Sequence, residues 1–368
     1  MNAKQLRDRV FIAHRYLGLA IGLLAVPIGL TGSIFIVHGW LGEAAAPSVV
    51  PTGERLPLEQ LIAMFRSKVP DVPLVLFNMS ESATAAIQAV WATDSKEISV
   101  YLNPYTGESI GSIKDGDPFI DLMWKIHVNL LGGEWGGYLA GIVGLLATIL
   151  CLTGIALWPG WRKLSVGFKI KWNATPKRLN FDLHKVAGII VAVFLSMAMA
   201  TGFIWNFSTW TEPFIYAVTL SSKPAKVVSK PQPGRDPIIL TEALLQKVNA
   251  ATPKGWIGRV RLATTPTGVI QIEKQLPSDA TVTASIDRYS GEILKIEGLP
   301  TEQKSLAQKV QDSFLPVHVG SFGGEASRLL YIFVGLSPTF LLGTGFIMWR
   351  NRKPTSRPDE PQLNVKLR

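Results

Sequence analysis

Cysteine and charged side chains are both scarce in this sequence of 368 residues. Charged residues make up 17% of it against 47% hydrophobic residues, and Cys151 is the only cysteine. A single cysteine excludes a disulfide framework and the C-x-x-C-H motif that attaches haem covalently. The sequence also has no P-loop, no H-E-x-x-H metal-binding motif and no G-x-G-x-x-G that follows a predicted strand. A flavin or nicotinamide site is therefore not expected, and any haem would be held by side-chain ligands alone.

Four long apolar stretches are present, at residues 16–38, 138–158, 185–207 and 329–349. Each reaches the ~20 helical residues that cross a hydrocarbon core of about 30 Å. The first resembles a signal peptide, because basic residues precede it and Ala44-Ala45-Ala46 follows it. Its apolar run is too long for the core of a signal peptide. We therefore predict four retained transmembrane helices.

Basic residues concentrate in the N-terminus, in the loop after the second stretch and at the start of the C-terminal tail. Lys and Arg in short loops mark the cytoplasmic side of a membrane protein. The net charge of +10 is thus a topology signal, and no nucleic-acid partner is expected. The prediction is a bacterial inner-membrane protein with cytoplasmic termini and periplasmic soluble segments. The predicted order is helix 1 with the N-terminus at 1–40, periplasmic 41–135, helix 2 at 136–160, cytoplasmic loop 161–182, helix 3 at 183–207, periplasmic 208–327, helix 4 at 328–350 and cytoplasmic tail 351–368.

The sequence also repeats itself, which predicts a duplicated unit of helix, soluble domain and helix. The segment His14–Leu19 matches His184–Ile189, 170 residues later, and a Thr-Gly pair begins 17 residues after each histidine. The later parts correspond at an interval of 191 residues, where His127, Thr153-Gly154 and Trp158 match His318, Thr344-Gly345 and Trp349. Between them, Leu56 and 103–108 match Leu240 and 287–292 at an interval of 184 residues.

Each soluble segment has the pattern of an α+β domain. A helix is expected to begin near Pro57 in the first and near Thr241 in the second, because Pro suits the first turn and Thr the N-cap. Strand-forming runs follow at 98–102 and 269–273. Gly107 and Gly291 stand where a hairpin turn needs positive φ. We expect two small antiparallel sheets, each covered by one helix.

Four of the five histidines occupy repeat-equivalent positions as two pairs, His14 with His184 and His127 with His318. Two neutral imidazoles facing each other across a helix bundle supply both axial ligands of a six-coordinate haem, a state suited to electron transfer. The simpler alternative is that these are interfacial side chains beside basic residues. Duplicated polar positions at a bilayer favour a function. We therefore predict haem b, one or two per chain with two preferred.

The remaining polar features near the spans have simpler explanations. His38 has no counterpart and lies about 24 residues, or ~36 Å, along the helix from His14. It is kept as a weak candidate ligand, and an interfacial side chain is the preferred explanation. The Thr-Gly pairs suit close helix packing or contact with a macrocycle, and packing is the simpler role. The glycines 132–137 and 323–324 either approach such a macrocycle or connect domain to membrane.

With these motifs, the chain resembles the PepSY-associated transmembrane family of iron-regulated inner-membrane proteins. The resemblance rests on His14-Arg15-x-Leu17-Gly18-Leu19, the two Thr-Gly pairs of the first half and the two turns of the soluble segments. Within that family, the chain looks most like the siderophore-iron reductases of the ferrioxamine reductase type. The resemblance implies two PepSY-like periplasmic domains, an inner haem bound by His14 and His184, and an outer haem bound by His127 and His318.

The leading hypothesis is a haem-b ferric-siderophore reductase that acts on the periplasmic side, with a hydroxamate siderophore as the expected substrate. Electrons come from a quinol or a cytoplasmic reductase, since the chain has no flavin motif. Hydroxamate oxygens are hard donors that hold Fe(II) less strongly than Fe(III), so reduction releases iron. A non-enzymatic periplasmic binding or regulatory protein is the first alternative. A siderophore transporter is the second, although four spans without a discontinuous helix suit it poorly.

Overall fold

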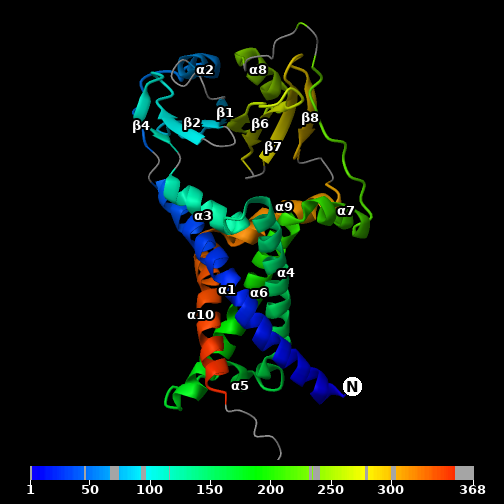
Figure 1. Cartoon of the computed structure of the whole chain (residues 1–368). Coiled ribbons are helices and arrows are strands. Elements are labelled where there is room, and N and C mark those ends of the chain that lie inside the picture. The colour runs from blue at the N-terminus through cyan, green and yellow to red at the C-terminus, as the bar shows by residue number, and fades with distance from the viewer. Residues whose placement is uncertain are drawn as a thin grey trace, which may run out of the picture. The chain divides into compact units, whose positions relative to one another are not determined.

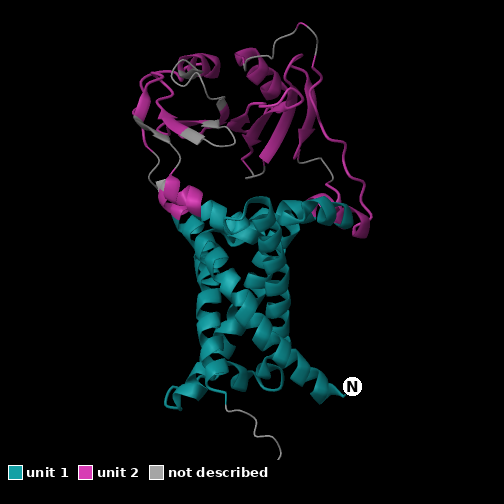
Figure 2. Cartoon of the chain, viewed as in Figure 1, with its two compact units in different colours: residues 1–37, 123–214, 310–368 teal, residues 38–122, 215–309 magenta. Residues whose placement is uncertain are grey.

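The computed structural model describes residues 2–44, 47–66, 74–92, 97–115, 117–231, 234, 241–277, 281–299 and 304–352. The chain divides into two compact units (Figure 2). One comprises 1–37, 123–214 and 310–368, and the other comprises 38–122 and 215–309. Residues 123–135 and 310–327, which the sequence placed in the soluble segments, thus belong to the first unit. Ala45, Ala46, Leu240 and the tail from Lys353 onward lie outside the described residues.

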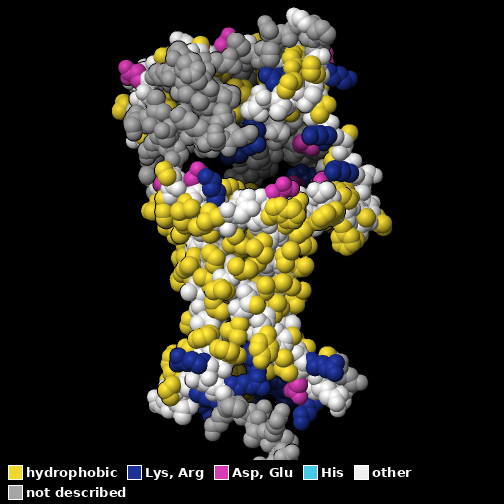
Figure 3. All heavy atoms as spheres, viewed as in Figure 1, with side chains coloured by type: hydrophobic (Ala, Val, Ile, Leu, Met, Phe, Trp, Pro, Cys, Tyr) yellow, Lys and Arg dark blue, Asp and Glu magenta, His cyan; other side chains and the backbone are white. Residues whose placement is uncertain are grey.

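Within the part of the chain that the structure describes, four helices are long and apolar enough to cross a membrane, as the sequence predicted. Figure 3 shows apolar side chains around them and Lys and Arg side chains at the end where the helix Leu164–Phe168 (α5) lies. Inside a bilayer these helices are surrounded by lipid tails and not by water. Large hydrophobic side chains can therefore remain on their outer surface. The four helices are α1 (Ala3–Ala44), α4 (Gly133–Leu157), α6 (Pro176–Asn206) and α10 (Gly324–Arg350) (Figure 1).

Small residues set how closely these helices approach. A Cβ at Gly29 on α1 would lie 2.3 Å from the carbonyl oxygen of Gly335 on α10. The Ser33 hydroxyl donates across the same crossing to the carbonyl of Ile332, at 2.9 Å. Gly144 gives α4 a similar approach to α6, where an added Cβ would lie 2.7 Å from the carbonyl oxygen of Met199. Packing through small residues is typical of membrane helices, which gain no hydrophobic effect from association in lipid.

Shorter helices adjoin the spans. Helix α3 (Pro118–Asn129) precedes α4, and α9 (Leu306–Val319) with the 3-10 turn η2 (Ser321–Gly323) precedes α10. The turn from α3 to α4 is tight, because a Cβ at Gly136 would lie 1.8 Å from the carbonyl oxygen of Asn129. Gly136 therefore allows α4 to begin directly after α3. The remaining helices of this region are the 3-10 turn η1 (Pro159–Trp161), α5 and α7 (Ser208–Val218).

The described residues of the second unit form one antiparallel sheet of eight strands in the order β4-β3-β2-β1-β5-β6-β7-β8. The sequence analysis predicted two separate sheets, and this was wrong. Strand β1 pairs with β5, which places Phe77 opposite Val260 and joins the strands of both soluble segments. The strands are β1 (Leu74–Asn78), β2 (Ile87–Ala92), β3 (Glu97–Leu102), β4 (Ser109–Asp115), β5 (Trp256–Arg261), β6 (Val269–Gln275), β7 (Thr281–Asp287) and β8 (Ile293–Glu297).

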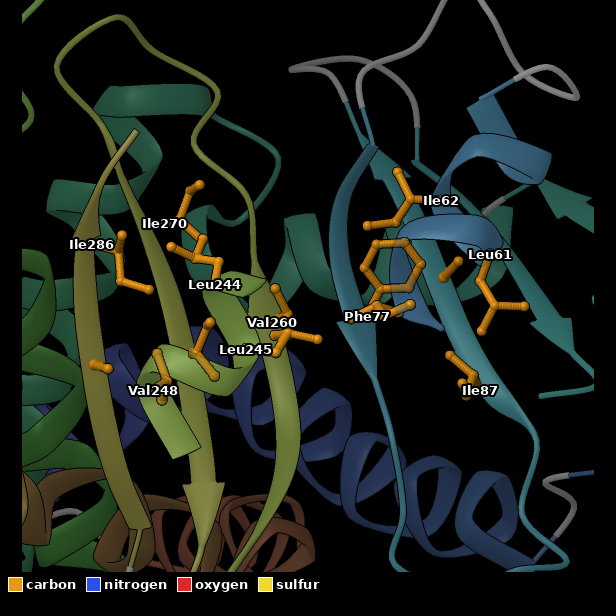
Figure 4. Packing of buried hydrophobic residues seen from close by; sticks show 14 of the residues in the cluster. Leu61, Ile62, Phe77, Ile87, Leu244, Leu245, Val248, Val260, Ile270 and Ile286 are labelled. Atoms are coloured by element: carbon orange, nitrogen blue, oxygen red, sulfur yellow. The ribbon is translucent and has the colours of Figure 1, made fainter. Parts of the chain in front are cut away.

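One hydrophobic core runs beneath both helices of this unit, α2 (Leu58–Arg66) and α8 (Glu242–Ala251) (Figure 4). Helix α2 contributes Leu61 and Ile62, each 1% exposed. Phe77 and Val260 are both fully buried side by side at the β1–β5 junction. Because an unpaired strand edge leaves N–H and C=O groups open, joining the two inner edges removes two such edges.

The predicted turns and helix starts are confirmed. Gly107 and Gly291 have φ of +72° and +69°. The carboxylate of Asp287 accepts hydrogen bonds from the backbone N–H groups of Tyr289 and Ser290, both at 2.8 Å. Burial raises the pKa of this carboxyl, but hydrogen bonds from backbone N–H groups outweigh it and hold the pKa below the usual value. The Thr241 side chain caps α8, as its position predicted.

Candidate functional site

The four paired histidines all lie on different helices of the first unit, which contains the four candidate spans and is called the transmembrane unit below. His14 is on α1 and His184 on α6, and both lie within candidate spans. His127 is near the end of α3 and His318 near the end of α9, just outside the spans that follow them. All four side chains are partly or largely shielded from solvent. Each therefore reaches the bundle from a separate element.

The outer histidines contact the Thr-Gly pairs of α1 and α6. The Nδ1 atom of His127 lies 3.0 Å from the hydroxyl of Thr31 and 2.9 Å from the carbonyl oxygen of Ile28. The Nδ1 atom of His318 lies 2.9 Å from the hydroxyl of Thr201 and 3.0 Å from the carbonyl oxygen of Ala198. The two halves of the chain thus hold their outer histidines in the same way.

The inner histidines use the Thr-Gly pairs of α4 and α10. His14 Nδ1 lies 2.9 Å from the hydroxyl of Thr153, and His184 Nδ1 lies 2.8 Å from the hydroxyl of Thr344. Each half of the chain therefore has two crossed contacts between its helices. In each half, the histidine in or just before one span contacts the threonine of the other span.

These contacts determine which ring nitrogen carries the proton. A carbonyl oxygen can only accept, so Nδ1 of His127 and of His318 must be the donor. The Thr153 hydroxyl donates to the carbonyl of Leu150 at 2.8 Å, and the Thr344 hydroxyl donates to that of Phe340 at 2.9 Å. Their oxygens are then free to accept from Nδ1 of the inner histidines. In all four rings the Nε2 lone pair is left for a ligand, the tautomer that a metal-binding histidine requires.

The glycine after each threonine leaves room for the imidazole. A Cβ at Gly32 would lie 3.2 Å from Cε1 of His127, and a Cβ at Gly154 would lie 3.2 Å from Cε1 of His14. The corresponding distances at Gly202 to His318 and at Gly345 to His184 are both 3.7 Å. A side chain at Gly32 or Gly154 would press on the ring, whereas a Cβ at Gly202 or Gly345 would only touch it at van der Waals distance. The Thr-Gly pair therefore combines a hydrogen-bond acceptor with the space in which the imidazole lies.

The structure brings the histidines of the outer pair together. The ring centroids of His127 and His318 are 5.9 Å apart, with an interplanar angle of 82°. Two imidazoles on opposite sides of one metal ion have centroids roughly 6 Å apart when each metal–nitrogen bond is about 2 Å long. The spacing of the outer pair therefore fits a shared iron.

Aromatic side chains pack against both outer imidazoles. The ring of Phe35 lies 5.6 Å from that of His127, and the ring of Trp205 lies 4.8 Å from that of His318. Phe35 and Trp205 each follow their Thr-Gly pair by one helical turn. The sequence analysis assigned them no such contact, although their separation of 170 residues matches the repeat interval.

Burial keeps the outer imidazoles neutral. It lowers the pKa of His127, and it lowers the pKa of His318 to about 4, where the charge of His127 adds a smaller effect. Neutral imidazole is the form that donates a lone pair to a metal.

His38, the fifth histidine, lies at the exposed end of α1 and belongs to the other compact unit. None of the contacts between histidine and threonine involves it. The sequence analysis preferred a packing role for the Thr-Gly pairs, whereas the structure places each of the four threonines against a histidine. Their constant spacing from the histidines was a usable signal: 17 residues from His14 to Thr31 and from His184 to Thr201.

One of the comparisons with known proteins, the match to a family model, agrees with the transmembrane architecture. A family model described as the PepSY-associated TM region matches residues 11–352, which include all four paired histidines. The comparison with curated proteins gave no significant match. Among solved structures, the chain is similar to a Clostridium difficile 630 protein described as a lipoprotein, with 10% identity, a TM-score of 0.26 and coverage of 68% of this chain and 97% of that one.

Proposed function

Because the chain belongs to the PepSY-associated transmembrane family, we propose that it is an inner-membrane electron carrier that holds haem b through four histidines and reduces ferric siderophores. One observation carries the proposal: a threonine binds Nδ1 of each of the four histidines and leaves Nε2 free. His127 and His318 would hold an outer haem, and His14 and His184 an inner one. When bound, haem supplies a one-electron redox centre.

The residues of the chain perform three tasks in this proposal. The threonines orient the imidazoles and keep their Nδ1 atoms protonated, which raises the basicity of the ligating nitrogen. The surrounding apolar helices exclude water from both sites. Two histidines at each site would be available to hold a haem, and haem held by two histidines would suit electron transfer.

The direction of transfer follows from the proposed topology. Basic segments would place His14 and His184 toward the cytoplasm and His127 and His318 toward the periplasm. A quinol or a cytoplasmic reductase would supply the electron, and a ferric siderophore, expected to be of the hydroxamate type, would accept it. Two haem sites, one from each histidine pair, would give the electron a path across the bilayer.

A visible spectrum of the detergent-purified protein, oxidised and dithionite-reduced, tests the proposal directly. We expect a b-type spectrum, and we expect a pyridine haemochrome assay to find about two haems per chain, one for each histidine pair. Anaerobic addition of ferric hydroxamate siderophore should reoxidise the reduced protein. Colourless protein after expression with ample haem would contradict the proposal and favour a non-enzymatic periplasmic binding protein.

Removal of a threonine hydroxyl should weaken haem binding without removing a ligand. In Thr153→Val, His14 loses its Nδ1 acceptor on α4 while side-chain volume is kept, and we expect roughly 10- to 100-fold weaker haem retention at the inner site. Transfer of haem to apomyoglobin measures this loss. Thr153→Ser keeps the hydroxyl and should behave as the parent protein.

Thr148→Val is the matched control on the same helix. The Thr148 hydroxyl donates to the carbonyl of Gly144 at 2.8 Å and lies within α4, as Thr153 does, but it contacts no histidine. Equal haem loss from both valine variants would show that the effect is one of helix packing, and the positioning role of Thr153 would then be wrong.

A further inference from the structure

Arg15 directly follows the inner histidine His14 and has a buried polar atom without a partner. Its Nη1 atom is shielded from solvent and has no hydrogen-bond partner among the described residues. Its guanidinium carbon lies 4.9 Å from the ring centroid of Phe11, which supplies no acceptor oxygen. A buried donor without an acceptor is costly, and the cost is greater when the donor is charged.

The equivalent position in the second half has no such deficit. Lys185 directly follows His184, and its Nζ donates to the Asp182 carboxylate at 2.8 Å. The same Nζ donates to the carbonyls of Val166 and Lys169, at 3.0 and 2.9 Å. An ammonium group has three protons, so these three acceptors satisfy it fully. The two cations next to the inner histidines thus differ: one is fully paired and the other is not.

No described acidic side chain of the transmembrane unit is placed to pair with Arg15. Both carboxylate oxygens of Asp182 are engaged, one by Lys185 and the other by Arg178 and the backbone N–H of Lys171. Asp8 is exposed and precedes Arg15 by seven residues, about 10 Å along the helix. The other acids of the described part of this unit belong to the end that carries His127 and His318: Glu134, Glu212, Asp312 and Glu325.

We propose that the Arg15 guanidinium binds a carboxylate of the group held by His14 and His184, namely a propionate of the inner haem. This inference rests on the proposed function. Haem b carries two propionates, and a guanidinium binds a carboxylate through charge-assisted hydrogen bonds. Arg15 neighbours an axial ligand in sequence, so a ligand at His14 brings its own anion to this end of the bundle. The second half needs no such anion, because Lys185 already has Asp182.

Haem dimethyl ester, in which both propionates are methylated, gives the sharpest test. Apoprotein of the parent and of Arg15→Gln is titrated with haem and with the ester, in His127→Ala protein so that binding at the inner site is observed alone. We expect Arg15→Gln to weaken haem binding by roughly 10- to 100-fold, the range for losing charge-assisted hydrogen bonds. The same substitution should change binding of the ester by less than about twofold.

A second measurement separates charge from folding. The midpoint potential of the inner haem should fall in Arg15→Gln, since a nearby cation favours the reduced iron, while the outer haem should keep its potential. Arg9→Gln removes an exposed cation from the same helix and should leave both potentials unchanged. An unchanged inner potential together with equal losses for haem and ester would overturn the role of Arg15.

The outcomes also distinguish the source of the anion and the two proposals. A lipid phosphate is the other candidate partner of Arg15. In that case Arg15→Gln would change the potential of the inner haem in phospholipid bilayers but not in phospholipid-free detergent, and this result would overturn the propionate assignment. Parent protein that binds no haem would instead defeat the proposed function itself. Failure of Arg15 alone leaves a haem protein whose inner propionates have another partner.

Discussion

Substitution of either outer histidine should remove about one of the two expected haems, because an iron that has lost one of its two axial ligands is held weakly. In His127→Ala, His318 remains as the other ligand, but the ring opposite it, with a centroid 5.9 Å away, is absent. We expect pyridine haemochrome to report about one haem per chain, and we expect ferric-siderophore reduction to be lost. The inner haem should keep its spectrum, since His14 and His184 lie on other helices.

His38→Ala is the matched control for this experiment. His38 is exposed at the end of α1 and contacts none of the four threonines, so its removal should leave haem content and reduction unchanged. A monodisperse elution profile for each variant shows that the bundle has folded. Unchanged haem content in folded His127→Ala and His318→Ala would remove the outer site from the proposal. Haem loss in His38→Ala would show that the fifth histidine had been wrongly set aside.

The largest expected effect on stability comes from a buried ion pair at the start of α6. The side chains of Asp182 and Lys185 are 0% and 4% exposed, and their charged atoms lie 2.8 Å apart. Lys185 also donates to the carbonyls of Val166 and Lys169. The pair therefore holds the segment between α4 and α6 against α6, the helix that carries His184. Asp182→Ala leaves a buried ammonium without its counter-charge, which costs about 3–5 kcal/mol.

Unfolding of the detergent-solubilised protein by SDS or heat measures this cost. Arg178→Gln is the control, because Arg178 binds the same carboxylate at 3.1 Å with a side chain that is 44% exposed. Because the Arg178 side chain is partly exposed and the buried carboxylate keeps Lys185, this variant should be destabilised less than Asp182→Ala. The joint replacement Asp182→Asn with Lys185→Met removes both charges and should recover much of the loss. A joint variant as unstable as Asp182→Ala would mean that the charges themselves do not decide stability here.

The sequence by itself determined the features that depend on local chemistry. Four spans follow from apolar length, because lipid provides no hydrogen bonds and a helix must satisfy its own backbone. The turns at Gly107 and Gly291 follow from a backbone conformation that glycine adopts without strain. The pairing of His127 with His318 was also inferred from the repeat, and the structure brings their rings together. The duplication itself remains a prediction from the sequence.

Only the tertiary structure decided the features that join residues distant in the chain. The alternating pattern of a strand predicts which face is buried but not which edge pairs with another, so two expected sheets proved to be one through β1 and β5. The same holds for Thr153 and His14, which are 139 residues apart in sequence. A threonine in an apolar helix satisfies its hydroxyl on its own backbone whether or not an imidazole lies nearby, so its contact with a histidine depends on how the helices cross.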